Sequence, residues 1–474
     1  MREMLVDEVR RAVRGRWMAV GADVTVTGVS TDSRTARRGD LFVALKGERF
    51  DGHDFLSAAA AAGCLAALVR QDLALAPSLS RSFGGGVIGV GDTTEALGQL
   101  AGHHRRLCPA TVVAVTGSNG KTTVKRMIHH ILSRRRAGSC SPKSFNNAVG
   151  LPLTLLAVGG RDDYVVCELG TNAPGEIAAL TRIAHPDVAV VTSVAETHLE
   201  KLGTLQRVAV EKASVLSGLA PSGIGVIWAD SELLDRAVRP YEVRLVRFGV
   251  NDKADLRLTG YEPAADGQRF QMNGRLWVRL PLPGRHNALN ALAAIAVAQR
   301  MGLEQDEAAS ALADMPGGEM RLERLRTGGL TVINDAYNAN PASVTAAADV
   351  LAETAGRRKV LIVGDMRELG EHSEELHLRT GRDVAGRKID LLIGVGTLGR
   401  YIATGASEKG LRCECFTSLA EACRGVPALL RRGDAVLIKG SRAMTMEKLL
   451  APIQQAFPPA GGRPGGRRRK DAAS

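Results

Sequence analysis

The stretch AVTGSNGKTTVK, residues 114–125, decides how the middle of this chain folds. It ends a buried-strand pattern, TVVAVTG (111–117), and opens a helical one, TTVKRMIHHILSRR (122–135). A glycine-containing turn between a strand and a helix is the setting of a phosphate-binding loop. Its backbone N–H groups converge on an anion, and the helix N-terminus adds partial positive charge. The alternative is an ordinary strand-to-helix turn that happens to contain Gly-Lys.

The spacing of the glycines departs from the commonest phosphate-binding loop. In the pattern G-x-x-x-x-G-K-[ST], counting back from Gly120 puts Val115 at the first glycine, whereas the chain has its glycine at position 117. Glycine still lets the backbone approach a phosphate, Lys121 can reach the terminal phosphates, and Thr122 can bind Mg²⁺. We therefore predict a nucleotide site over Gly117, Ser118, Asn119, Gly120, Lys121, Thr122 and Thr123.

The chain divides into three blocks around this loop. Residues 109–315 alternate strand and helix patterns, which predicts a central domain with a parallel sheet covered by helices. Residues 316–458 show a second alternating series and predict a Rossmann-like domain, without the G-x-G-x-x-G of a dinucleotide site. Residues 1–108 predict a smaller α/β domain, and residues 459–474 predict a disordered basic tail. The predicted fold class is therefore α/β with three domains.

The bulk composition narrows the class of protein. A chain of 474 residues is expected to form two or three cores. No apolar run is long enough to span a bilayer and the N-terminus lacks a secretion signal, so we predict a cytoplasmic protein. Seven scattered cysteines fit free thiols in a reducing compartment. The net charge of +12 invites nucleic-acid binding, but the tail supplies part of it and only 4% of residues are aromatic, so we expect no nucleic-acid partner.

Two further side chains fall at strand ends near the loop. Glu168 lies in the strand pattern YVVCELG (164–170), and His198 follows VAVVTSV (188–194). The carboxyl ends of parallel strands meet at the edge where open α/β sheets bind ligands, so both are expected beside Thr122. A carboxylate and an imidazole there can hold a divalent cation, although histidine is an uncommon ligand of Mg²⁺. Taken singly, each also fits a solvated loop residue or a helix cap.

Lys212 interrupts the apolar stripe of a predicted helix. It lies four residues from both Val208 and Leu216, on the face that also carries Leu205 and Val215. A charged ammonium on such a face is costly unless it is paired. Either the side chain snorkels to the edge of the stripe, or it turns towards an active site and is neutralised or modified there.

A set of motifs occurs together along the chain. They are TGSNGKTT (116–123), ELGTNAPGEI (168–177), ETHLEKLGT (196–204), EKAS (211–214) and GRHNALNALAA (284–294). This set resembles the Mur ligases of peptidoglycan assembly, three-domain ATP-dependent enzymes that have folylpolyglutamate synthase as a relative. The resemblance covers essentially the whole chain. It also accounts for the unusual loop, because the family carries its glycine where this chain has Gly117.

Other segments indicate the substrates that the resemblance implies. STDSRTARRGDLFVALKGERFDGHDF (30–55) resembles a UDP-binding module, so residues 1–108 are expected to bind a UDP-linked substrate. The family members that join D-alanyl-D-alanine to UDP-N-acetylmuramoyl-tripeptide are matched by SFNNAVGLPLTLL (144–156), NDAYNANPASVTAA (334–347), VGDMRELG (363–370) and KGSRAMTME (439–447). The motif D-[ND]-P-R, usual in the member that adds diaminopimelate, does not occur.

The resemblance also implies roles for individual residues. Lys121 would bind the γ-phosphate, Glu168 and His198 would hold metal between ATP and the substrate carboxylate, and Lys212 would be carbamylated and help to position a second Mg²⁺. The ATP site would be completed by His286, Asn287, Asn290, Arg321 and Asp335. The UDP substrate would contact Ser30, Thr31, Asp32, Ser33, Arg34, Lys46, Gly47, Asn146 and Asn147, and the dipeptide would contact Asn338, Asp365, Lys439 and Ser441. Many relatives have Gly-Arg where this chain has Met320-Arg321, and Arg324 is close by.

The activity that the resemblance implies is ATP-dependent amide-bond formation through an acyl phosphate. ATP and Mg²⁺ are the expected cofactors, and a monomer is expected. Catalysis would rest on Lys121, Lys212, His198 and Glu168. Two alternatives stay open: a relative that adds a different amino acid or peptide, and a basic P-loop ATPase that is stimulated by nucleic acid.

Overall fold

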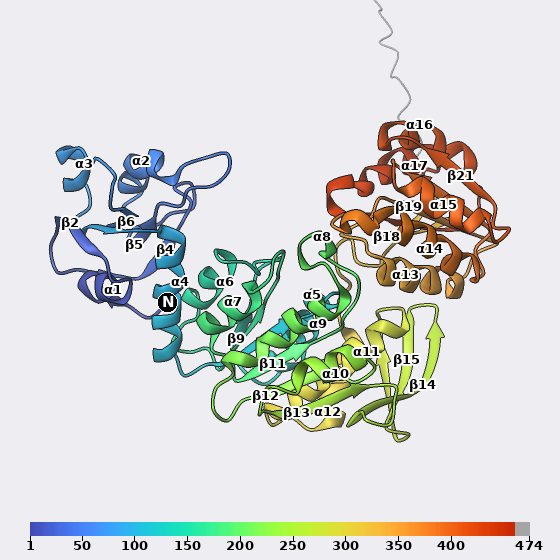
Figure 1. The fold of residues 1–474 in the computed structure, drawn as a ribbon, viewed down its shortest axis with the longest axis horizontal. Coiled ribbons are helices and arrows are strands. Elements are labelled where there is room, and N and C mark those ends of the chain that lie inside the picture. Colours follow the sequence, from blue (N-terminus) through green and yellow to red (C-terminus); the bar gives the residue numbers. More distant parts are fainter. Residues whose placement is uncertain (460–474) are drawn as a thin grey trace, which may run out of the picture.

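Each of three α/β units along the chain is built around its own sheet (Figure 1). The structure, a computed structural model, describes residues 1–459. Residues 460–474, nearly all of the predicted basic tail, lie outside the described residues. The predicted fold class, α/β with three domains, is confirmed. Within residues 1–459, no helix combines the length and the apolar character that crossing a bilayer requires.

The N-terminal unit contains a five-stranded sheet in the order β2-β7-β6-β5-β4. Strands β4 to β7 pair in parallel, and β2 pairs with β7 in the antiparallel direction. Helix α4 leads into the next unit and begins after Asp92, whose carboxylate accepts hydrogen bonds from the backbone N–H groups of Thr94 and Glu95. The elements are β1 (Met4–Leu5), α1 (Val6–Ala12), β2 (Arg16–Val20), β3 (Thr25–Val26), β4 (Gly28–Ser30), β5 (Asp40–Val43), α2 (Leu56–Ala61), β6 (Ala66–Arg70), α3 (Pro77–Arg81), β7 (Gly86–Val90) and α4 (Thr93–Leu107).

The central unit contains a nine-stranded sheet in the order β16-β15-β14-β13-β12-β11-β8-β10-β9. The pairings from β9 through to β14 are parallel, as expected. The strands are β8 (Thr111–Thr116), β9 (Gly138–Cys140), β10 (Tyr164–Glu168), β11 (Val188–Val191), β12 (Ile224–Trp228), β13 (Arg244–Gly249), β14 (Leu256–Ala264), β15 (Gly267–Met272) and β16 (Leu276–Leu280). The helices are α5 (Lys121–Leu132), α6 (Gly150–Leu156), α7 (Glu176–Ala184), α8 (Leu199–Leu202), α9 (Leu205–Ala213), α10 (Glu232–Val238), α11 (Arg285–Arg300) and α12 (Gln305–Ala311).

Strands β14, β15 and β16 form an antiparallel extension that the sequence analysis did not predict. One face of this extension meets solvent, so buried and exposed side chains alternate along it. In β16, Val278 and Leu280 are buried, whereas Trp277 is 41% exposed. The apolar residues are therefore spaced by two and give no continuous apolar run of the kind that marks the parallel strands.

Helix α11 lies beside the glycine-containing loop. It is buried along most of its length, and its buried side chains are mainly small or aliphatic, among them Ala291, Ile295 and Ala298. These side chains let it pack closely against α5, the helix that follows the phosphate-binding loop. The N-terminal part of α11 is thereby held beside the loop, with Asn290 next to Gly120.

The C-terminal unit contains a six-stranded sheet in the order β17-β18-β22-β19-β20-β21. All neighbours pair in parallel except β17 and β18. Helix α13 begins with a capping box in which the Asn340 side chain accepts from the Ser343 backbone N–H, and Pro341 occupies the first turn. The elements are β17 (Glu323–Thr327), β18 (Leu330–Asp335), α13 (Pro341–Glu353), β19 (Arg358–Gly364), α14 (Ser373–Ala385), β20 (Leu391–Val395), α15 (Gly399–Ser407), β21 (Cys413–Phe416), α16 (Leu419–Leu429), β22 (Asp434–Lys439) and α17 (Leu450–Ala456).

The strand order of the central unit brings three loops to one edge. Strand β8 lies between β10 and β11 and is parallel to both, so the residues after Thr116, Glu168 and Val191 leave the sheet side by side. The C-terminal unit contacts the central unit near this edge, for example through an ion pair of 2.7 Å between Arg379 and Glu196. Figure 1 shows the N-terminal and C-terminal units at opposite ends of the view, with the central unit between them.

Candidate active site

A cavity of about 750 Å³ lies between the central and C-terminal units. The central unit supplies residues 118–123 of the glycine-containing loop, the strand ends at Glu168 and Thr192, and the start of α11. The C-terminal unit supplies Arg321, the segment that follows β18, and the first turns of α13. A ligand in this cavity would therefore touch both units at once.

The two glycines of the loop are required by its backbone. Gly117 has a φ of 144°, and a Cβ atom there would lie 2.0 Å from Oγ1 of Thr192. Gly120 has a φ of 83°, and a Cβ atom there would lie 2.4 Å from Oδ1 of Asn290. Val115, by contrast, is a fully buried residue of strand β8. The position of the usual first glycine is therefore still strand in this chain, and the turn begins two residues later.

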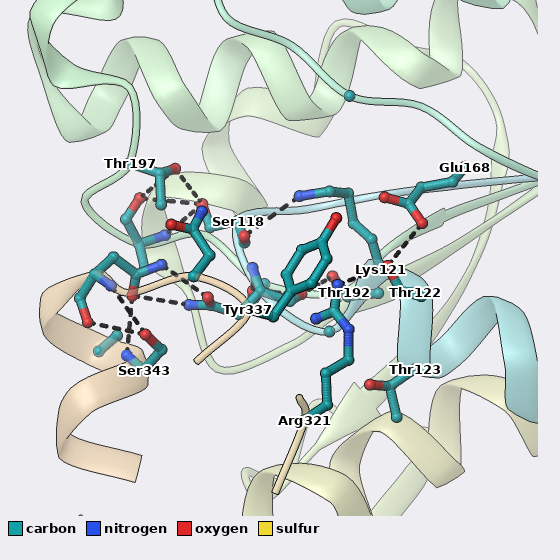
Figure 2. Close-up of a pocket in the computed structure, with 18 of the residues that line it drawn as sticks. Ser118, Lys121, Thr122, Thr123, Glu168, Thr192, Thr197, Arg321, Tyr337 and Ser343 are labelled. Atoms are coloured by element: carbon teal, nitrogen blue, oxygen red, sulfur yellow. Dashed lines mark hydrogen bonds between the residues drawn. The ribbon is translucent and has the colours of Figure 1, made fainter. Parts of the chain in front are cut away.

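The neighbouring loop after β11 holds the glycine-containing loop in place. The backbone N–H of Ser118 donates to the Ser193 carbonyl at 2.9 Å, and the N–H of Asn119 donates to Ser193 Oγ at 2.9 Å. Lys121 Nζ donates to the Gly117 carbonyl at 2.7 Å and to the Ser118 carbonyl at 3.4 Å, so the ammonium lies over its own loop. Figure 2 shows the contact with Ser118. Burial lowers the pKa of Lys121, and the nearby Glu168 carboxylate opposes that shift. The loop is thus held by hydrogen bonds to the neighbouring loop, and the Lys121 ammonium lies over it.

Thr122 and Glu168 meet directly, as predicted from their strand and helix positions (Figure 2). Thr122 Oγ1 donates to Glu168 Oε2 at 2.8 Å, and Asn146 Nδ2 donates to Glu168 Oε1 at 2.9 Å. Both ends of the carboxylate are therefore oriented. The predicted UDP-site residue Asn146 contacts this carboxylate, and Asn147 also lines the cavity.

Lys125 is a second cation at this carboxylate, and the sequence analysis missed it. Its Nζ lies 3.6 Å from Glu168 Oε2 and donates to the carbonyls of Ser141 at 2.8 Å and Lys143 at 2.5 Å. The side chain is only 2% exposed. Its position four residues after Lys121 was the available signal, because residues four apart share a helix face.

His198 lines the cavity from the loop after β11, and its Nδ1 lies 2.6 Å from Oε2 of Glu368 in the C-terminal unit. This hydrogen bond lowers the pKa of Glu368. His198 has a φ of 55° and Glu368 a φ of 67°. The predicted metal residue is thus paired with a residue of another unit that the sequence analysis did not single out.

The side chains fit a divalent cation that depends on its substrate for most ligands. No group of three or more His, Cys, Asp or Glu side chains within residues 1–459 is arranged to hold a metal. Mg²⁺ is commonly held by one or two carboxylates, with water and phosphate oxygens completing its shell. The hydroxyl of Thr122 and the carboxylate of Glu168 provide such an incomplete set at the loop.

Lys212 is buried in the central unit without a polar partner. It is 0% exposed, and its Nζ has no hydrogen-bond partner among the described residues. Burial lowers the pKa of Lys212 far below its ordinary value, and the positive charge of Lys121 adds to that shift. The alternative of a snorkelling lysine is excluded by this burial. Lys212 is not among the residues that line the cavity.

The start of α11 forms another wall of the cavity through His286, Asn287 and Asn290. Asn290 Nδ2 donates to Asn287 Oδ1 at 3.1 Å, and Asn287 Nδ2 donates to the Pro283 carbonyl at 2.7 Å. Burial lowers the pKa of His286, which favours the neutral imidazole. These contacts give a fixed polar wall beside the loop.

Arg321 reaches from the C-terminal unit to the loop, where one of its terminal nitrogens donates to Thr122 Oγ1 at 3.0 Å. Arg324 instead donates to the carbonyl of Ala265, away from the cavity lining. Met320 has a φ of 51°, a conformation that glycine adopts without strain. The backbone at Met320 would therefore accept the glycine that the resemblance leads us to expect there.

The four residues predicted for the dipeptide separate into two pairs. Asn338 and Lys439 line the cavity, and Lys439 Nζ lies 2.6 Å from Oδ2 of Asp335, which also lines it. Asp365 and Ser441 are buried and do not line it.

Asp365 and Ser441 instead hold Arg367, which lines the cavity: Asp365 contacts its side chain and Ser441 its backbone. Asp365 Oδ2 lies 3.0 Å from a terminal nitrogen of Arg367, and Ser441 Oγ accepts from the Arg367 backbone N–H at 2.8 Å. Arg367 lines the cavity and was not predicted. It lies three residues beyond the end of strand β19, and that placement near a strand end was the signal for it.

The remaining UDP-site candidates lie in the N-terminal unit and do not line this cavity. Ser30, Thr31, Asp32, Ser33 and Arg34 form a turn after β4, in which the Arg34 side chain lowers the pKa of Asp32 to about 2. Lys46 and Gly47 are exposed residues of the loop after β5. These residues are therefore separate from the cavity.

Three family models match successive parts of the chain. They are "Mur ligase family, catalytic domain" over residues 25–105, "Mur ligase middle domain" over residues 115–298, and "Mur ligase, glutamate ligase domain" over residues 320–442. With the fold and the glycine-containing loop, these matches define the class: the chain belongs to the Mur ligase family.

Individual relatives narrow the comparison. The chain is 39% identical to the UDP-N-acetylmuramoyl-tripeptide–D-alanyl-D-alanine ligase of Escherichia coli, over 92% of this chain and 95% of the relative. It is 37% identical to the Bacillus subtilis protein of the same name, over 90% and 92%. Among solved structures, MurF from Acinetobacter baumannii has a TM-score of 0.87 at 31% identity, covering 96% of this chain and 99% of that one. MurF from Thermotoga maritima in complex with ADP has a TM-score of 0.80 at 27% identity, covering 91% and 98%.

Proposed function

We propose that this protein joins D-alanyl-D-alanine to UDP-N-acetylmuramoyl-tripeptide, with ATP converted to ADP and phosphate, in the synthesis of peptidoglycan precursors. The observation that carries the proposal is the cavity in which Lys121, Glu168 and Arg321 converge on one phosphate-binding loop from two units. Relatives with this named activity match more than nine-tenths of their own length to the chain, which supports the same assignment.

The proposed chemistry requires a carboxylate to become a better acyl donor. An oxygen of the tripeptide carboxylate attacks the γ-phosphorus of ATP, the bond to the β-phosphate oxygen breaks, and an acyl phosphate forms. The amine of D-alanyl-D-alanine then attacks the acyl carbon. The C–N bond forms, the bond to the phosphate oxygen breaks, and the amine loses a proton. Both steps require exclusion of water, which closure of the two units around the cavity would provide.

Each charged side chain has a place in this scheme. Lys121, which rests on the Gly117 carbonyl, would exchange that contact for the terminal phosphate. Arg321 would add a second positive charge from the C-terminal unit. In the proposed site, Thr122, Glu168 and His198 are the residues that would hold Mg²⁺, which when bound neutralises charge on the phosphates. Lys212, carbamylated at its Nζ, would add an anionic ligand.

The two substrates would occupy opposite ends of the site. The UDP moiety is assigned to the turn after β4 and to Lys46 and Gly47 in the N-terminal unit, and the dipeptide is assigned to Asn338, Lys439 and the residues that support Arg367 in the C-terminal unit. The acyl group would then lie over the central unit. We further propose that the protein acts in the cytoplasm, as a monomer.

A substrate panel tests this function. The purified protein is incubated with ATP, Mg²⁺ and UDP-N-acetylmuramoyl-tripeptide, and ADP release is measured with D-alanyl-D-alanine, with single amino acids, or with no acceptor. We expect ADP release to require the dipeptide, and mass spectrometry to show a product heavier by one dipeptide less one water. Release with a different acceptor alone would assign the other ligase activity. Release stimulated by nucleic acid without any acceptor would refute ligation.

A further inference from the structure

Tyr337 lies against Arg321 in the cavity (Figure 2). It follows strand β18, and its backbone N–H donates to the Met320 carbonyl at 3.2 Å. The Cζ atom of Arg321 lies 3.9 Å from the centroid of the Tyr337 ring, which is a close cation–π contact. The sequence alone predicts no role for this tyrosine, and the proposed ligation chemistry does not use it.

Arg321 needs an orienting contact that leaves its charge available. Its side chain is long, and the flanking residues Met320 and Leu322 have φ values of 51° and 53°. Within residues 1–459, Arg321 forms no ion pair with a carboxylate. A carboxylate would orient the guanidinium but would also neutralise it against a phosphate. An aromatic face instead orients the guanidinium plane and leaves its N–H donors and its charge for the anion.

The ring is itself held from the central unit. The Tyr337 hydroxyl hydrogen-bonds with Oγ of Ser144. The backbone of the segment just before Ser144 is anchored by Lys125, whose Nζ donates hydrogen bonds to the carbonyls of Ser141 and Lys143. Ser144 therefore sits on a fixed segment, and its contact with Tyr337 spans the boundary between the two units.

We infer that Tyr337 is a positioning residue that holds Arg321 over the phosphate-binding loop when the C-terminal unit is seated on the central unit. The inference rests on the proposed function, because it takes the anion beside Arg321 to be the phosphate that is transferred. The ring orients the guanidinium, and the hydroxyl ties the ring to Ser144. An alternative use of the ring, stacking on a substrate base, predicts a different experimental pattern.

A double-mutant cycle tests this inference. The variants Tyr337→Leu, Arg321→Ala and their combination are compared by steady-state ADP release with saturating substrates. Loss of a cation–π contact worth roughly 0.5–2 kcal/mol corresponds to a fall in kcat on the order of 2-fold to 30-fold in Tyr337→Leu. In the Arg321→Ala background the same change is expected to lower kcat by less than about 2-fold, because its target is gone. Equal losses in both backgrounds would overturn the inference.

Further variants separate the ring from its hydroxyl. Tyr337→Phe keeps the ring and is expected to retain most of the activity, and Ser144→Ala is expected to have the same small effect without adding to it. A large rise in the KM for ATP in Tyr337→Leu, with kcat unchanged, would assign the ring to base stacking and overturn the inference. Tyr337→Met replaces Tyr337→Leu in the cycle if the leucine variant does not fold.

Tyr401 provides a matched control. It is stacked with Arg400 at 4.9 Å in the same C-terminal unit and does not line the cavity. Tyr401→Leu is expected to leave kcat unchanged, and a loss equal to that of Tyr337→Leu would indicate a general effect on the unit and overturn the inference. The cycle is run with whichever acceptor the substrate panel identifies. A change of acceptor would therefore refute the proposed dipeptide without deciding the role of Tyr337.

Discussion

Lys125 and Lys212 are both almost completely buried in the central unit, with exposures of 2% and 0%, yet their surroundings are opposite. Lys125 on α5 contacts two carbonyls and the carboxylate of Glu168. Lys212 on α9 has no polar partner among the described residues. Burial lowers the pKa of both. The largest charge effect on Lys125 comes from Glu168, which opposes the shift, whereas the largest on Lys212 comes from Lys121, which adds to the shift and is opposed by the smaller effect of Glu211.

The difference shows that burial alone does not reveal what a lysine does. A buried lysine with satisfied donors is a cross-link, and its removal leaves other polar groups without partners. A buried lysine without partners costs the fold free energy, so its retention indicates a chemical use. For Lys212 that use would be attack of the neutral amine on CO₂, which forms an N–C bond, releases a proton and leaves an anion.

The largest expected effect is on stability, in Lys125→Met. The substitution leaves the carbonyls of Ser141 and Lys143 without this donor and removes the buried cation beside the Glu168 carboxylate, so we expect a loss of about 3–5 kcal/mol. Thermal unfolding followed by calorimetry measures it, as a lower denaturation temperature of the central unit. Lys143→Met, which changes an exposed side chain, is the control and should leave that temperature unchanged. An unaltered temperature in Lys125→Met would show that the cross-link contributes nothing.

The next effect is on turnover, in Lys212→Ala. If the modified lysine supplies an anionic ligand, its loss should lower kcat on the order of 100-fold, the size seen when residues that support a metal are removed. A short carboxylic acid such as acetate should restore part of the activity by occupying the space that the side chain leaves. Turnover is measured by ADP release with and without acetate. Full activity without acetate would end the assignment of Lys212 to catalysis.

The smallest expected effect is a gain in stability, in Lys212→Met, opposite in sign to the loss expected in Lys125→Met. Lys212→Met removes a buried amine without a partner, so in CO₂-free buffer we expect a gain in the free energy of unfolding of about 1–4 kcal/mol. The folded-state pKa of Lys212 is lowered, so between that pKa and the ordinary 10.5 the unfolded chain binds more protons than the folded one. The wild-type protein therefore gains stability as pH rises through this window, and the advantage of Lys212→Met should be larger at the lower pH.

Denaturant unfolding of the wild type and Lys212→Met at two pH values within the stable range of the protein measures this. A loss of stability in Lys212→Met would mean that the amine has a partner in solution. The contrast between the two lysines would then disappear.

Much of the predicted phosphate-binding part of the site could be predicted from the sequence, because its residues lie close together along the chain or at neighbouring strand ends. The loop from Gly117 to Thr122 is continuous, and its backbone geometry requires glycine at two defined places. Glu168 was predictable because its strand, β10, runs parallel to β8, and parallel neighbours end at the same edge of the sheet. The parallel strands were recognised by continuous apolar runs, and for the same reason the half-solvated strands β14 to β16 were missed.

The contacts between units could not be predicted from the sequence in this way. Tyr337 and Ser144 are 193 residues apart, and His198 and Glu368 meet only because the C-terminal unit sits on the edge of the central sheet. Arg367 lines the cavity and is held there by Asp365 and Ser441. These two residues were assigned to the dipeptide, but in the structure they support Arg367. No local pattern encodes such pairings.

The sequence by itself determined the α/β class, the glycine-containing loop predicted to bind phosphate, and the anomaly of a lysine on an apolar helix face, because each depends on residues within a few turns or strands. Only the tertiary structure decided which polar groups are satisfied. Whether Lys125 has partners and Lys212 has none depends on which distant segments pack against α5 and α9. The free energy of a buried charge is set by those neighbours, and the chain brings them together only when it folds.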